Sequence, residues 1–414
     1  MATTGSVSLS FKTSAVDSVT LAGRTRLGRV QNAEFGTNLP NTLIQELGSD
    51  RNVGRVYDLA DITVTVNAID VGARNSFALA GIDWASVPSG TYIELQDMKY
   101  TCLVESFKSL STDDIAQTLF VPGAKLNRVT FNYAVGSDAT EEYQFNGTDR
   151  KWLKYDVAVA SGVTATSGVF TFSPDARVLK DGSYILAAFA SGIGYLAPEV
   201  ITASTATTAT FDSNTVADGT PVLVAYHADL SNQWDYTYQY PHVAPDYTPP
   251  PDQPVGMRGF GAEIYLVKSG QSNNRVYRAQ TLNLQAQYQT TKVQELGTES
   301  VVGYSDGVPD ITGTLEILLH DFLLQQQLAG DTVGDNWTPN ELGNGEYGIL
   351  VELYRRGVDR AVVGPEKSVF FRTMEITGET DRSQVGSDTR QSWQIAVRDG
   401  NCYICRGAFT ALPW

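Results

Sequence analysis

Apolar and polar residues alternate along this chain mostly with period two, which is typical of half-buried β-strands. Residues 61–67, Asp-Ile-Thr-Val-Thr-Val-Asn, alternate in this way, and residues 310–317, Asp-Ile-Thr-Gly-Thr-Leu-Glu-Ile, do the same. Further strands are expected at residues 92–95, 125–133, 142–145, 348–354, 368–376 and 392–397. The pattern therefore predicts a mainly β protein.

Helical periodicity is rare, and it follows each of the two long alternating segments. Residues 319–329 are predicted to form a short helix that ends at Gly330, a good helix stop. Residues 70–80 are predicted to form the equivalent helix, ending at Gly81, with Gly72 weakening its interior. Each alternating segment should thus carry one flanking helix.

The chain contains an internal repeat. Residues 26–81 align without a gap with residues 275–330, and 17 of the 56 aligned positions are identical. The tetrapeptide Gln-Glu-Leu-Gly, at 45–48 and again at 294–297, lies in this block. A shift of 250 positions, one more than before, then aligns the two Val-Gly-Ser-Asp segments that begin at Val135 and Val385. Two copies of one domain are therefore expected, an arrangement that usually builds something quasi-symmetric.

The segment between the copies has no counterpart in either. Residues 160–230 are rich in Thr, Ala, Ser and Val, and strands are expected at 168–172, 183–189, 199–203 and 221–226. These suffice for a small all-β domain. Residues 240–254 hold six prolines in 15 residues, which predicts a semi-rigid extended linker.

This organisation predicts four parts. They are a first repeat domain at 1–157, an inserted small β domain at 158–240, a Pro-rich linker at 241–257 and a second repeat domain at 258–414. A long polar stretch precedes the central strand of each repeat, at 36–59 and 285–308. It is either a hairpin or arm that reaches a neighbouring subunit or a plain surface loop, and the residues favour neither.

The charge and the lengths of the apolar runs argue against several classes of protein. The 414 residues carry a formal net charge of -16 without any Lys or Arg run, which argues against a surface that grips nucleic acid. The longest apolar run, 185–197, is too short to span a bilayer and is broken by Ser191 and Gly192. The N-terminus lacks the features of a secretion signal.

The cysteines indicate no disulfide framework. There are three, Cys102, Cys402 and Cys405, so buried or idle thiols in a protein made in a reducing cytoplasm are expected. Cys402 and Cys405 have the spacing of half a zinc site, but the second half is missing. The histidines, which are scattered, are His227, His242 and His320.

No other pattern points to a catalytic or ligand site. The carboxylate pairs Asp113-Asp114 and Glu141-Glu142 are expected on a solvated surface. The glycines of 256–261 precede a strand, not the helix that a dinucleotide site needs, and the acidic residues of 331–340 are expected to form a polar loop. Alternating aromatics at 234–240 could stack on sugars, but docking of the linker is the favoured interpretation. No catalytic, cofactor-binding or metal-binding residue is predicted, and the chain is not expected to be an enzyme.

The second copy resembles a known family. Lys292-Val-Gln-Glu-Leu-Gly, followed by Asp310-Ile-Thr-Gly-Thr-Leu-Glu-Ile and a short helix, resembles the tail tube proteins of long-tailed, siphovirus-like bacteriophages. The resemblance covers about 258–414, and 24–155 more faintly, where Val64 and Asn67 replace Gly313 and Glu316.

The resemblance implies two tandem β-sandwich or barrel domains, each with one flanking helix, joined edge to edge into rings. Six domains normally make each ring, so a fused pair implies a trimeric, pseudo-hexameric ring. Stacked rings would form a tube for the genome and a tape measure protein, with the inserted domain as outer decoration. The protein would then lie in the virion tail, assembled in the host cytoplasm, with partners that are copies of itself, other tail proteins and passing DNA that it does not specifically bind. No membrane partner is expected.

The alternative from the same residues is a β-rich adhesin or receptor-binding tail component that uses the aromatic stretch near Trp234. An enzyme that acts on polysaccharide has little support. The repeat discriminates between the first two, because a tube needs two equivalent copies and an adhesin does not.

Overall fold

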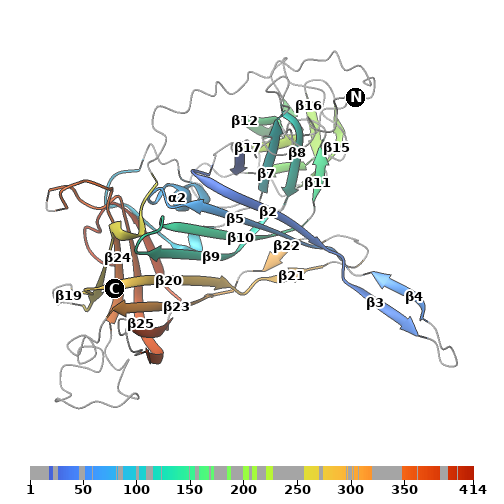
Figure 1. The fold of residues 1–414 in the computed structure, drawn as a ribbon. Coiled ribbons are helices and arrows are strands. Elements are labelled where there is room, and N and C mark those ends of the chain that lie inside the picture. Colours follow the sequence, from blue (N-terminus) through green and yellow to red (C-terminus); the bar gives the residue numbers. More distant parts are fainter. Residues whose placement is uncertain are drawn as a thin grey trace, which may run out of the picture.

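The computed structural model describes residues 18–21, 27–45, 52–98 and 102–153 with short gaps, the strands between 158 and 226, and residues 256–318 and 347–414 with short gaps. These parts are mainly β and hold one large antiparallel sheet (Figure 1). The predicted helix at 319–329, the Pro-rich linker at 240–254 and the aromatic stretch at 234–240 lie outside the described residues, as do the loop at 331–340, Asp113-Asp114 and all three histidines.

Each copy contributes four strands to the large sheet in the same order. In the first copy these are β2 (Val30–Asn38), β5 (Asp61–Ile69), β10 (Thr140–Gly147) and β9 (Lys125–Ala134). In the second they are β20 (Ala279–Tyr288), β23 (Pro309–Leu318), β26 (Arg390–Val397) and β25 (Lys367–Arg382). The strand order therefore follows the sequence repeat.

The registers of the two copies also coincide. Ile62 pairs with Gly147 in β5–β10, and the aligned residues Ile311 and Val397 pair in β23–β26. The irregularity in the β10–β9 ladder, between Gln144 and Phe145, recurs at the aligned place in β25–β26. A second irregularity occurs at the start of β2 and again at the start of β20. The two copies therefore share the positions of these β-bulges as well as the order of their strands.

A second group of strands is also repeated. The first copy has a four-stranded sheet of β1 (Ser18–Leu21), β7 (Cys102–Lys108), β8 (Ile115–Pro122) and β11 (Lys151–Leu153). The second copy has the same order in β18 (Ala262–Val267), β24 (Tyr347–Leu353), the first half of β25, and β27 (Cys402–Arg406), with the short β19 (Asn274–Arg275) outside β18. Strand β25 belongs to both groups, and Thr373 within it has a positive φ of 53°.

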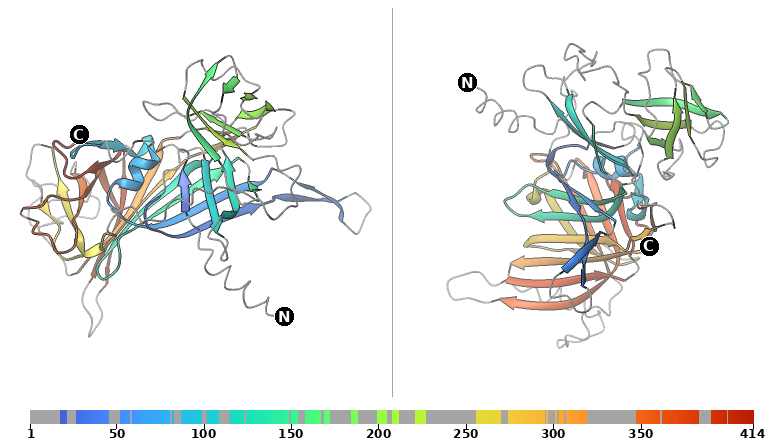
Figure 2. Two further views of the ribbon diagram at one scale, coloured as in Figure 1. Left: turned by 90° about the horizontal axis from the view of Figure 1, so that it is seen from above. Right: turned by 90° about the vertical axis from the view of Figure 1, so that its right-hand side faces the viewer.

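The polar stretch before each central strand forms a hairpin. In the first copy, β3 (Asn41–Gln45) pairs with β4 (Asn52–Tyr57), and this arm projects far from the sheet (Figures 1 and 2). In the second copy, β21 (Thr291–Val293) pairs with β22 (Gly303–Ser305). A hairpin is therefore present in both copies, and its contact with a neighbouring subunit stays a prediction.

The segment between the copies forms a closed six-stranded barrel. Its strands are β12 (Ala158–Thr166), β13 (Val169–Thr171), β14 (Tyr184–Ala187), β15 (Glu199–Ser204), β16 (Thr208–Phe211) and β17 (Pro221–Tyr226). Closure leaves no sheet edge exposed in this element.

The predicted helix at 70–80 is shorter than expected. Helix α2 spans Arg74–Leu79, and the four residues before it are not helical. Gly72 has a φ of +80°, a conformation that turns the chain before the helix begins. The strand β6 (Tyr92–Glu94) follows, continuing into the short 3-10 turn η3 (Leu95–Asp97), and a second such turn, η4 (Gly259–Gly261), precedes β18.

The core is shared by both copies. Inward-facing residues of β5, β9 and β10 belong to one hydrophobic cluster with those of β20, β23, β24 and β26. Its largest fully buried side chains include Trp393, Tyr143, Tyr347 and Phe131. Met257, at the end of the predicted linker, is also buried there, and its N–H donates to the Asp70 carbonyl over 2.7 Å. The boundaries of the predicted domains stay a prediction, since the two copies share one core.

Gly313 in β23 gives a test of this packing. Its aligned residue, Val64, is fully buried, but a Cβ at Gly313 would lie 2.4 Å from the Asn283 carbonyl oxygen and 2.6 Å from Leu284 Cδ2. We expect Gly313→Val to lower the free energy of unfolding by about 1–3 kcal/mol through overpacking. Denaturant unfolding measures this, and Thr314→Val on the exposed face should change it by no more than about 0.5 kcal/mol. Equal stability of both variants would contradict the packing described.

Candidate functional site

The two copies meet by pairing the last sheet strand of the first with the first sheet strand of the second. Strand β9 runs antiparallel to β20, from Ala134 opposite Thr281 to Arg128 opposite Gln287, without a break in register. Figure 1 shows β2, β5, β10, β9, β20 and β23 side by side. The contact is head to tail, because different edges of the repeat meet.

Side chains on both faces of this junction are well matched. Leu284 and Phe131 lie opposite each other and are both buried, as are Ala286 and Val129. On the polar face, Asn283 Nδ2 donates to the side-chain oxygen Oδ1 of Asn132. Gln287 Nε2 likewise donates to Asn127 Oδ1 over 3.0 Å. The junction therefore combines a backbone ladder, apolar packing and side-chain hydrogen bonds.

The same two edges are open at the ends of the described sheet. Strand β2 pairs only with β5 among the described strands, although its aligned strand β20 is paired on both sides. The second half of β25, residues 375–382, pairs only with β26, although its aligned strand β9 is also paired on both sides. Open edges present unpaired N–H and C=O groups that template pairing with another chain.

Burial reflects this difference. The inward-facing residues of β20 are buried, whereas the aligned residues of β2, Ala33 and Phe35, are only partly buried against the core. Leu39, aligned with the buried Tyr288, keeps 56% of its surface exposed. Ile376 in β25 is also only partly buried, although its aligned residue Leu126 is fully covered. Both open edges therefore leave apolar surface that a neighbouring strand would cover.

The internal junction also predicts the register of an external one. Transferring the β9–β20 pairing by the repeat offsets places Thr37 opposite Glu379, and Glu34 opposite Arg382. The second pair takes the positions of the hydrogen-bonded Asn283 and Asn132, and it carries opposite charges. Opposite charges on facing strands are a favourable cross-strand pair.

A buried ion cluster lies where the copies meet. Lys367 of β25 contacts Asp70 over 2.8 Å and also contacts Glu141 of β10, and all three side chains are fully buried. Tyr143 donates to Glu141 Oε2 over 2.7 Å. The prediction that Glu141-Glu142 lies on a solvated surface is therefore wrong for Glu141. Successive residues of a strand face opposite sides, so only Glu142 reaches the polar face, where Arg128 binds it over 2.6 Å.

Burial dominates the electrostatics of this cluster. Burial, with Asp70 nearby, raises the pKa of Glu141 to about 7, and the contacts with Lys367 and Tyr143 only partly oppose this. Burial alone would lower the pKa of Lys367, but Asp70 and Glu141 together outweigh it and hold that pKa above its usual value. Two carboxyl groups thus share one ammonium group in a site without water contact.

The ion cluster has no counterpart at the open edges. The residues aligned with Asp70, Glu141 and Lys367 are Leu319, Gln391 and Gln117, which carry no charge. The internal junction therefore has a buried charge cluster that the external one lacks. Neither spacing nor periodicity could have revealed the cluster, since Asp70 and Lys367 stand 297 residues apart.

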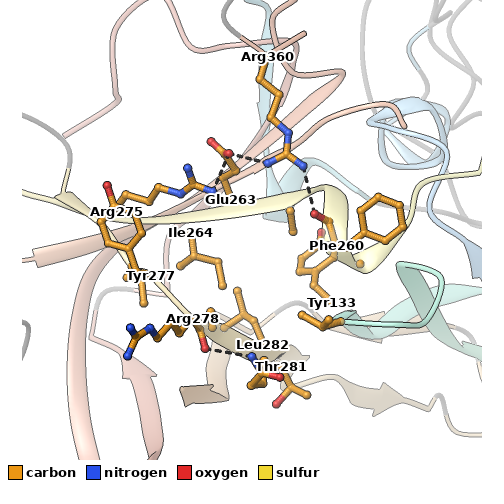
Figure 3. A pocket seen from close by; sticks show the side chains of 16 residues that line it. Tyr133, Phe260, Glu263, Ile264, Arg275, Tyr277, Arg278, Thr281, Leu282 and Arg360 are labelled. Atoms are coloured by element: carbon orange, nitrogen blue, oxygen red, sulfur yellow. Dashed lines mark hydrogen bonds and ion pairs between the residues drawn. The ribbon is translucent and has the colours of Figure 1, made fainter. Parts of the chain in front are cut away.

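A surface pocket of about 200 Å³ lies beside η4, β18 and β20 (Figure 3). Glu263 in its wall accepts from Arg360 over 2.6 Å and from Arg275 over 2.9 Å, and the Tyr265 hydroxyl donates to it over 2.6 Å. Arg275 also lies over the ring of Tyr277. Glu263 holds two of the three arginines that line the pocket, and its ion pair with Arg360 ties the segment around that residue to β18.

The cysteines of the second copy are buried free thiols. Cys402 and Cys405 are both fully covered, and burial raises the pKa of Cys405 to about 12, so its thiolate is scarce at neutral pH. Within the described residues, no group of three or more His, Cys, Asp and Glu side chains is placed to hold a metal ion. No helix in the described part of the chain is long and apolar enough to cross a membrane.

Comparison with known proteins adds no relative: no family model matches this chain, and no curated protein matches it. The candidate functional site consists of the two open edges, at β2 and at residues 375–382, together with the β9–β20 junction that predicts how they pair.

The Glu263 cluster makes a prediction on pH. Hydrogen bonds from Tyr265 and Arg360, with the charge of Arg275, outweigh the effect of burial and hold the pKa of Glu263 below its ordinary 4.5. A depressed folded-state pKa contributes stability above pH 4.5 that is lost as pH falls through the folded-state value.

We therefore expect Glu263→Gln to lower the free energy of unfolding by about 1 kcal/mol at neutral pH, because both arginines are partly exposed to solvent. The difference from the native protein should shrink as the pH falls below 4.5. Urea unfolding at several pH values measures this. A difference that grows as the pH falls would contradict the assignment.

Proposed function

We propose that this chain is a structural subunit that pairs edge to edge with copies of itself into closed rings, stacked as a viral tail tube. The observation that carries the proposal is the β9–β20 junction inside one chain, together with the same two edges left open at β2 and at residues 375–382. A head-to-tail contact that closes by rotation gives a ring, and repetition along the axis gives a tube. Ring closure also removes both open edges.

The resemblance of the second copy to tail tube proteins supports the same assembly and implies the number of chains in each ring. Six repeat units in a ring correspond to three chains, each a pair of sandwich-like units with a hairpin arm. The arm formed by β3 and β4 projects away from the sheet, in keeping with a contact to an adjacent subunit. The inserted barrel would lie outside the tube. No catalytic role is part of this proposal.

The polar face of the large sheet suits passage of DNA without binding. It is dominated by uncharged side chains, which include Thr63, Thr65, Asn67, Gln144, Asn146, Asn283, Gln285, Gln287, Thr312 and Thr314. Two of its arginines are occupied by carboxylates, since Arg128 pairs with Glu142 and Arg390 with Glu316. A lining of this kind offers few free cations to phosphates, so DNA would pass as cargo.

A disulfide scan tests the predicted register. Thr37→Cys combined with Glu379→Cys places two thiols directly opposite each other across the external junction, where paired Cα atoms lie about 4.5–5.5 Å apart. We expect covalent multimers up to a closed trimer under mild oxidation, seen on a non-reducing gel. Rings or tubes should be visible by negative-stain electron microscopy.

The matched control moves one cysteine by one position. Thr37→Cys with Thr380→Cys points the thiols to opposite faces of the sheet, so it should form few covalent multimers. Equal cross-linking by both pairs would refute the register, and a chain that stays a monomer under all assembly conditions would refute the ring.

The charge pair at the external junction gives a second test. Glu34→Arg or Arg382→Glu alone places like charges on facing strands, and we expect each to raise the concentration needed for assembly about fivefold, from a cost of about 1 kcal/mol. The double variant restores opposite charges and should assemble almost as well as the native protein. Sedimentation velocity measures the three cases, and failure of the double variant to recover would count against this pairing.

A further inference from the structure

The buried cluster of Lys367, Asp70 and Glu141 has the arrangement of a reactive centre. Lys367 Nζ lies 2.8 Å from Asp70 Oδ2 and also contacts Glu141 Oε1. The three side chains are fully buried, and the ring of Phe131 lies 4.7 Å from Nζ. An amine, a carboxyl group and a second carboxyl group are thus held together out of contact with water.

The remaining atoms of both carboxyl groups are fixed by neighbours. Asp70 Oδ1 accepts from the Gly72 N–H over 2.8 Å, and Asp70 Oδ2 accepts from the Tyr133 hydroxyl over 3.4 Å. Glu141 Oε2 accepts from Tyr143 over 2.7 Å and from Asn75 over 3.3 Å. These contacts fix the Asp70 carboxyl group beside Lys367 and give its two oxygens different surroundings.

We propose that Lys367 and Asp70 join in an amide bond that the folded chain forms by itself, with Glu141 carrying the proton. The bond would covalently connect the two copies at their internal junction. The proposal is independent of the assembly into rings, since it concerns one chain only.

The reaction balances without any co-reactant. A bond forms between Nζ and Cγ, and the bond between Cγ and Oδ2 breaks. Nζ gives up two of the three protons of the ammonium group and keeps one as the amide N–H. Oδ2 takes those two protons and leaves as water, one of them having passed through Glu141, which ends unchanged. Oδ1 remains as the amide oxygen, and the Gly72 N–H that binds it stabilises the charge that develops there in the transition state.

The surroundings favour this direction. A buried ion pair retains a large desolvation cost, whereas an amide is neutral, so the reaction removes two charges from an apolar site. Fixed reactants at contact distance also react as if highly concentrated. The water produced is diluted into bulk solvent, and the apolar surroundings of the site disfavour the return of water for the reverse hydrolysis.

Proton transfer within the cluster makes the amine nucleophilic. The ammonium form of Lys367 dominates beside two carboxyl groups, but passing one proton to Asp70 cancels both charges at once. Glu141, whose pKa burial raises to about 7, holds or releases a proton near neutrality, as a proton carrier must. The other junction cannot react in this way, because Leu319, Gln391 and Gln117 occupy the aligned positions.

Mass spectrometry of the purified full-length protein tests the proposal. The intact denatured chain should be lighter than its sequence by one water molecule. Trypsin does not cleave after an acylated lysine, so residues 361–372 should appear as one peptide, linked through Lys367 to residues 56–74 through Asp70. A full sequence mass together with cleavage after Lys367 would overturn the proposal.

Variants separate the roles. Lys367→Met should abolish the loss of water, and Glu141→Gln should reduce bond formation to a small fraction of the native extent. Glu142→Gln is the matched control on the opposite face of β10, and it should leave the bond intact. Native-level linkage in Glu141→Gln would overturn the role of Glu141, and loss of linkage in Glu142→Gln would overturn its assignment to the buried carboxyl group. Whether the bond exists is decided by the mass of the native protein alone. That test therefore stays conclusive even if one of the variants fails to fold.

Discussion

Strand β9 of the first copy and strand β20 of the second share an unbroken antiparallel ladder, and the rest of the sheet is arranged around that contact. The ladder carries the first copy's sheet directly into that of the second and lets both share one core. Because it joins opposite edges of a repeated unit, it necessarily leaves one edge of each kind open. The two open edges of the described sheet are thus a direct result of the internal contact.

The two junctions of such a subunit need not be equally strong. Inside the chain, the ladder is reinforced by pairing of β6 with β27 and by the charges around Lys367, which are shielded from solvent. The residues aligned with this charge cluster are neutral, and the predicted contact between the open edges relies on a backbone ladder with Glu34 and Arg382. In the proposed ring, the fused pair would therefore be a permanent building block, and its external contacts would stay adjustable during assembly.

The sequence predicted the strands well where one face is buried and the other is wet. Residues 61–67 and 310–317 alternate clearly, and both lie in the expected strands. It overestimated the helix at 70–80, because Gly72 turns the chain by a backbone conformation that periodicity does not detect. It placed Glu141 in solvent, because a carboxylate in a strand is expected on the exposed face. The lysine that accompanies Glu141 in the core is far away in the sequence. The repeat alone does not predict the β9–β20 junction, because the strand order that places β9 and β20 at the edges of their copies is not visible in the sequence.

The β-bulges have a consequence for size. Each bends its strand and increases the local twist, and the two bulges in the first copy's part of the large sheet recur at the aligned positions of the second. In a closed sheet, strand tilt and stagger fix the radius. Two units with the same bends would contribute equal arcs to a closed ring. The width of the bore of any ring built from this chain would then be set by these four bulges within each subunit, before the subunits assemble.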